Sequence, residues 1–96
     1  MPRTVRDAKL DTRSARFRLA ARREPYWRSI SNRLAVGYRK GAKGGTWIAR
    51  HYTAEAGRRF NALGTADDVA DADAVHVLTF GQAQEAARAW FAALAR

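Results

Sequence analysis

The feature that most constrains this chain is a glycine-punctuated stretch over residues 37–64, GYRKGAKGGTWIARHYTAEAGRRFNALG. Three short runs with aromatic, β-branched or alternating character occupy residues 34–39, 46–53 and 58–63. The connections between them, GAKGG and AEAG, have the length and the glycines that join hairpin strands. The pattern predicts a three-stranded antiparallel β-sheet, which requires a cover on one face to be stable.

The C-terminal segment is the part of the chain that can supply this cover. Thr79 is a good N-cap, and Gln82 three residues later completes a capping-box pattern. Apolar residues then recur at three- and four-residue spacing and form one stripe, at Phe80, Ala83, Ala87, Trp90, Phe91 and Leu94. The sequence therefore predicts an α+β fold, in which the sheet packs against a C-terminal α-helix within one domain, residues 25–96.

Side chains on a strand alternate between the two faces of a sheet, which allows the faces to be assigned. One consistent solution directs five apolar residues toward the helix, namely Leu34, Val36, Trp47, Ala49 and Leu63. It leaves Arg39, Arg50, Tyr52 and one arginine of the third strand on the open face. A bulge would invert the parity of the third strand, so its assignment stays open.

The flanking segments carry charge but few apolar residues. Residues 1–24 hold eight Lys/Arg and are expected to form a flexible basic arm, with a solvated tail as the alternative. Residues 26–30, after Pro25, form a short extended run that docks the base of this arm on the sheet. Residues 65–75 contain four aspartates but lack the glycine and glutamate of an EF-hand loop, which favours a solvated loop.

The charge distribution indicates a polyanionic partner. The net charge is +9, and residues 1–50 hold 14 Lys/Arg against three acidic residues. A basic half of this density favours nucleic acid, although a merely soluble, cationic protein is the alternative.

No catalytic pattern is present. The chain has no cysteine, and His51 and His76 are isolated from other candidate metal ligands. Phosphate-loop and nucleophile-elbow motifs are absent. We therefore expect no catalytic residues, no metal, no cofactor and no small-molecule substrate. The sequence also lacks an apolar run of about 20 residues and a secretory signal, so the expectation is a cytoplasmic protein without a membrane partner.

A basic sheet face, a basic turn and a basic arm favour binding to double-stranded DNA, because a β-ribbon fits the major groove. The candidate DNA-binding residues lie on the three strands and the first turn: Arg39, Lys40, Lys43, Thr46, Arg50, Tyr52, Arg58, Arg59 and Asn61.

The order GYRK, GGTWIARHY, RRFNALGTADD and LTFGQAQEAARAWF resembles the N-terminal region of phage-type integrases, the tyrosine recombinases. The resemblance runs from about residue 24 to the end and depends mostly on GGTWIAR, LGTADD and QAQEAARAWF. It implies an arm-binding domain for DNA integration and recombination, whose three-stranded sheet enters the major groove; plant ethylene-response domains are similar in plan. The family's core-binding and catalytic domains would lie beyond Arg96, so this chain is expected to bind DNA without cleaving it. Other integrase protomers are a further candidate partner.

Two other functions remain open. One is a protein-interaction or regulatory domain with an incidental basic arm. The other is an RNA-binding module, because a basic sheet with aromatic residues can stack single-stranded bases.

Overall fold

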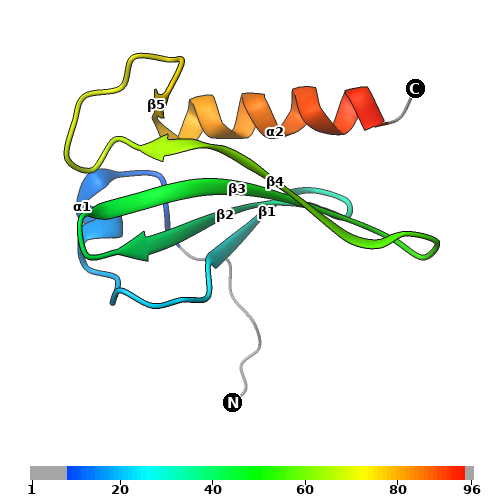
Figure 1. Cartoon of the computed structure of the whole chain (residues 1–96), viewed down its shortest axis with the longest axis horizontal. Helices are drawn as coiled ribbons and strands as arrows, with labels where there is room; N and C mark the ends of the chain where they lie inside the picture. Colours follow the sequence, from blue (N-terminus) through cyan, green and yellow to red (C-terminus); the bar gives the residue numbers. More distant parts are fainter. Residues whose placement is uncertain (1–8, 95–96) are drawn as a thin grey trace.

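The fold is a curled β-sheet with a long helix across one face (Figure 1). The computed structural model describes residues 9–94 of the chain. Its elements in chain order are α1 (Arg13–Phe17), β1 (Tyr26–Ser31), β2 (Leu34–Gly41), β3 (Gly44–Thr53), β4 (Gly57–Ala66), β5 (Val77–Leu78) and α2 (Phe80–Leu94).

The sheet has five strands in the order β1-β2-β3-β4-β5. The first four are antiparallel neighbours, whereas β5 pairs parallel to the end of β4. The α+β class and the C-terminal helix are confirmed, and the three predicted antiparallel strands are present as β2, β3 and β4. The prediction that the sheet has only these three strands is wrong. The run after Pro25 is a full strand that pairs with β2, and the two-residue β5 closes the other edge.

The core lies between the sheet and α2. The fully buried Val36, Trp47 and Ala49 face Ala83 and Ala87 of the helix. The assignment of these strand residues to the helix side is confirmed. Their alternation on β2 and β3 is unbroken, which explains why it could be read directly from the sequence.

A bulge lies in β4 at Leu63. Trp47 pairs with Gly64 and Ile48 pairs with Ala62, so Leu63 is the extra residue, and its side chain packs against the core. The register beyond the bulge settles the parity that the sequence left open. Arg58, Phe60 and Ala62 share the open face, and Arg59 and Asn61 lie on the helix side.

Part of the segment expected to be a flexible arm is folded onto the sheet. Residues 1–8 lie outside the described residues, but Leu10 and Arg16 are almost completely buried. Thr12 caps α1 by accepting a hydrogen bond from the Ala15 amide at 3.0 Å. The Arg16 guanidinium donates to the Leu10 carbonyl at 2.8 Å, which closes this segment around its own side chain. The structure therefore differs from the prediction for residues 10–24.

The aspartate-rich loop also differs from the solvated loop that was expected. Asp67 forms an ion pair with the buried Arg16, and Asp68 accepts from the Arg16 Nε at 3.0 Å. Asp68 also accepts from the Tyr38 hydroxyl and from the Gly45 amide. The two carboxylates thus hold α1, β2 and β3 together, because a buried guanidinium requires such partners.

The start of α2 forms the capping box that the sequence predicts. The Thr79 hydroxyl accepts from the Gln82 amide at 3.1 Å, and the Gln82 side chain accepts from the Thr79 amide at 2.9 Å. These two bonds satisfy backbone donors that the first turn of a helix leaves without partners. The capping box therefore fixes where α2 begins on the sheet.

Candidate nucleic-acid interface

The candidate interface is the open face, which we define as the side of the sheet opposite α2. Its side chains from β2, β3 and β4 follow from the register: Arg39, Thr46, Ile48, Arg50, Tyr52, Arg58, Phe60 and Ala62. Trp27 of β1 joins them, because it pairs with Gly37 and lies on the same face.

Trp27 lies flat across the sheet at Gly37. A Cβ atom at position 37 would come within 2.6 Å of the Trp27 ring, so only glycine leaves room for the indole here. The ring reaches toward Phe60 on β4, with 6.1 Å between the ring centroids. Trp27 of β1 and Phe60 of β4 therefore form the apolar floor of the open face.

Arg50 stacks on this floor. Its guanidinium carbon is 4.2 Å from the centroid of the Trp27 ring, a cation–π arrangement. Partial burial and, secondarily, the positive charge of Arg58 lower the pKa of Arg50 from its ordinary value. Both causes disfavour the charged form, and an anion placed beside Arg50 would oppose both.

A groove runs along the open face over Trp27 and Phe60. Its walls carry four arginines and one acidic residue, namely Arg22, Arg39, Arg50, Arg58 and Glu24. Within residues 9–94, none of these four arginines forms an ion pair with a carboxylate.

Backbone carbonyls position two of the groove arginines. The Arg39 Nε donates to the Arg23 carbonyl at 3.0 Å, and the Arg22 Nε donates to the Glu24 carbonyl at 3.0 Å. The Arg22 guanidinium also stacks on Tyr26, with 3.6 Å between its carbon and the ring centroid. Because these partners are backbone carbonyls and an aromatic ring, no carboxylate neutralises the positive charges of Arg22 and Arg39. The segment before β1 thus supplies one wall of the groove.

The structure brings together five of the nine predicted site residues. Arg39, Thr46, Arg50, Tyr52 and Arg58 lie on the open face. Lys43 is exposed in the β2–β3 turn.

The other three predicted residues lie elsewhere. Arg59 and Asn61 project from the helix side of β4, so they do not share a surface with Arg50. Lys40 donates from its ammonium to the carbonyls of Arg16, Phe17 and Leu19, at 3.0, 2.8 and 2.7 Å. Lys40 is thus occupied in holding the C-terminal end of α1.

Sequence reasoning missed Trp27 and Arg22 as members of the groove. The sequence pattern indicates only that residues 26–30, which include Trp27, dock the arm on the sheet, and Arg22 belongs to the expected flexible arm. The signal that could have located Trp27 is Gly37, an open-face position without a side chain beside a possible strand. No comparable signal points to Arg22, because its place depends on how the segment before β1 folds.

The described part of the chain contains no group of three His, Asp or Glu side chains arranged to hold a metal ion. No helix within residues 9–94 has the length and apolar character needed to cross a membrane.

Comparison with known proteins finds no matching family model, no matching curated protein and no matching solved structure. The similarity to integrases therefore stays a prediction that depends on the motifs in the sequence.

Proposed function

We propose that this chain is a double-stranded DNA-binding module that contacts DNA through the open face, of the kind that tyrosine recombinases carry near their N-terminus. The observation that carries the proposal is the groove in which Arg22, Arg39, Arg50 and Arg58 converge with a single acidic residue. Phosphate groups are the natural partners of such a cluster, because arginine binds them through charge and a planar fork of donors.

The four arginines have different roles in this proposal. Arg22, Arg39 and Arg58 line the groove around Arg50 and contact phosphates. Arg50 lies mid-strand above Trp27, where it reaches base edges once the sheet enters the major groove. The phosphate contacts set affinity and register, whereas the Arg50 contact contributes sequence preference.

The aromatic residues favour duplex DNA over a single strand. A stacking platform needs aromatic rings whose faces are free for bases. Trp27 lies against Gly37 and contacts Arg50, and the Arg33 guanidinium lies 5.9 Å from the centroid of the Tyr52 ring. Phe60, at 57% exposure, offers the most accessible ring of the three. One such ring is a poor platform for successive bases.

The test is a titration of the full chain with labelled duplex DNA, single-stranded DNA and RNA of equal length, at two salt concentrations. We expect the tightest binding to the duplex. If all four groove arginines contact DNA, log K should fall with log salt with a slope of about −3 to −4. Tighter binding to RNA or single-stranded DNA would support a stacking module instead, and no binding to any of the three would support a protein-interaction domain.

A further inference from the structure

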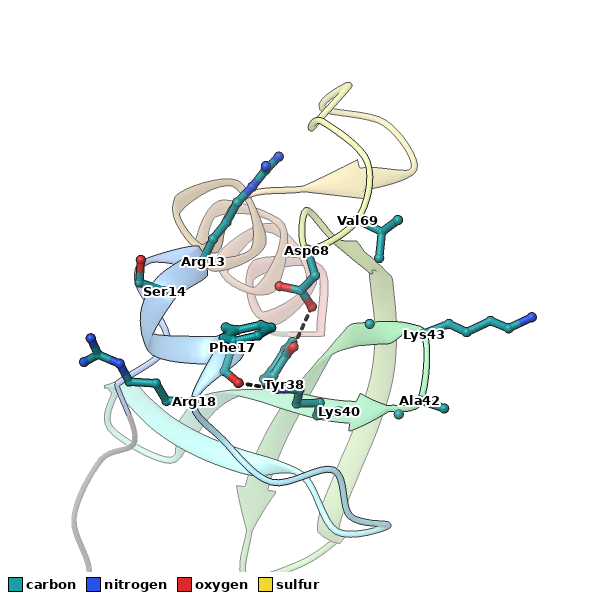
Figure 2. A pocket seen from close by; sticks show the side chains of 12 residues that line it. Arg13, Ser14, Phe17, Arg18, Tyr38, Lys40, Ala42, Lys43, Asp68 and Val69 are labelled. Atoms are coloured by element: carbon teal, nitrogen blue, oxygen red, sulfur yellow. Dashed lines mark hydrogen bonds between the residues drawn. The ribbon is translucent and has the colours of Figure 1, made fainter.

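A cavity lies at the end of the sheet where a turn joins β2 and β3. It is bounded by α1, by the β2–β3 turn and by the start of the aspartate-rich loop, and Figure 2 shows it from close by. Its volume is about 680 Å³. The buried Tyr38 lies in its lining and belongs to the helix side of the sheet, so this cavity and the Arg50 groove lie on different faces.

Two large apolar side chains at this cavity are exposed to solvent. Phe17 is 83% exposed and Val69 is 78% exposed, although the core of the domain lies close by. Apolar side chains gathered at a concave site are typical of places where another molecule docks. Neither side chain is needed for the core, which is formed by other residues.

The walls of the cavity are held rigidly. The Lys40 ammonium donates to the Phe17 carbonyl at 2.8 Å and lies 5.4 Å from the centroid of the Phe17 ring. On the other side, the carboxylate of Asp68 is fixed by Tyr38, Gly45 and Arg16. A site whose walls are fixed in advance loses little conformational entropy when it binds a partner.

The charge that is free around the cavity is positive. Arg18 and Lys43 are exposed and extend outward on opposite sides (Figure 2), and neither forms an ion pair with another described residue. Arg13, by contrast, is paired with Asp71 at 2.9 Å. A partner with an apolar centre and acidic flanks would match this arrangement.

We propose that this cavity binds a protein segment in which one apolar side chain is flanked by carboxylates. The apolar side chain packs between Phe17 and Val69, and the carboxylates meet Arg18 and Lys43. A nucleic acid fits less well, because its phosphate backbone offers no apolar group to the exposed Phe17 and Val69 side chains. The proposal does not depend on DNA binding, since the open face lies on the other side of the sheet.

The test uses an array of defined peptides, each with an apolar residue at its centre and two aspartates or glutamates on each side. In the matched control array, serine replaces the central residue, so charge is conserved while the anchor is lost. Binding of the full chain is measured by fluorescence and located by amide chemical shifts. The test variant is Phe17→Ser with Val69→Ser, which keeps every charge and changes only exposed side chains.

We expect peptides with a central apolar residue to bind at least about tenfold more tightly than their serine controls, with shifts at residues 17, 43 and 69. The double variant should abolish this difference while its melting temperature stays unchanged. Equal binding to both arrays would overturn the proposal, as would shifts confined to the open face. If duplex DNA competes with the peptide and replaces its chemical-shift changes at residues 17 and 69, the cavity is a nucleic-acid site instead.

Discussion

Replacing Arg16 with methionine would remove the charge at the centre of the buried network while keeping an apolar side chain of similar length. The Arg16 side chain is 1% exposed and joins Asp67, Asp68 and the Leu10 carbonyl. Removing one partner of a buried ion pair costs about 3–5 kcal/mol, because the remaining charge has lost its compensation. The Asp67 and Asp68 side chains retain 12% and 15% exposure, so water compensates them in part, and we expect the lower end, about 3 kcal/mol.

Urea unfolding followed by tryptophan fluorescence measures this cost. With an m-value of about 1–3 kcal/mol/M, a loss of about 3 kcal/mol lowers the unfolding midpoint by about 1–3 M. The matched control is Arg18→Met. Arg18 lies two residues after Arg16 and its side chain is exposed, so this substitution should change the free energy of unfolding by less than about 0.5 kcal/mol. If the two variants unfold at the same urea concentration, the Arg16 network does not hold residues 10–24 on the sheet.

Three further predictions concern single positions. Gly45→Ala should lower the free energy of unfolding, measured by urea titration, by about 1–3 kcal/mol, because the added Cβ would lie 2.2 Å from the Tyr38 ring. Gly41→Ala should be nearly neutral, because the atom nearest to its added Cβ lies 3.5 Å away. Burial, and next the hydrogen bond to Asp68, raise the pKa of Tyr38. The contribution of the neutral Tyr38 to the free energy of unfolding is therefore complete below about pH 10 and is lost as the pH rises further. Tyr38→Phe should flatten the alkaline part of a stability profile measured from pH 8 to 11.5. Thr79→Ala should lower stability by about 1 kcal/mol and reduce amide protection in the first turn of α2, and unchanged hydrogen exchange there would contradict the capping assignment.

The features that could be predicted from sequence depend on short-range patterns. The α2 stripe repeats every three or four residues, and its capping box spans Thr79 to Gln82. The core-facing residues of β2 and β3 follow from alternation within each strand. Local spacing is sufficient for both, because helices and strands impose fixed periods on the side chains that they bury.

The features that were missed depend on contacts between distant parts of the chain. Arg16 and Asp67 are 51 residues apart. Each lies in a segment whose composition, considered alone, indicates a solvated chain. Only their pairing makes burial of both favourable. The parallel pairing of β5 with Thr65 and Ala66 is equally hard to predict, since two residues do not specify a partner strand.

The candidate site shows the same division. Arg39 and Arg50 could be assigned to one face by alternation. Arg58 could not, because the bulge in β4 decides which residues of that strand reach the open face. Arg59 and Asn61 share a strand with Arg58 but face the other way, which single-strand reasoning left open. Lys40 is removed from the site by its bonds to α1, a helix that the sequence did not predict.

The most direct test of the central claim compares two double variants that each remove two positive charges. Arg50→Ala with Arg58→Ala removes two of the four groove arginines, and Arg59→Ala with Arg88→Ala removes charge from the helix side of β4 and from α2. Circular dichroism first confirms that both variants are folded, and duplex DNA binding is then measured at matched salt concentrations. We predict that the open-face pair weakens binding by about tenfold or more and reduces the salt slope by about 1–2, while the helix-side pair changes both much less. Equal losses in the two variants would contradict the account, because they would show that net charge, and not the open face, determines binding.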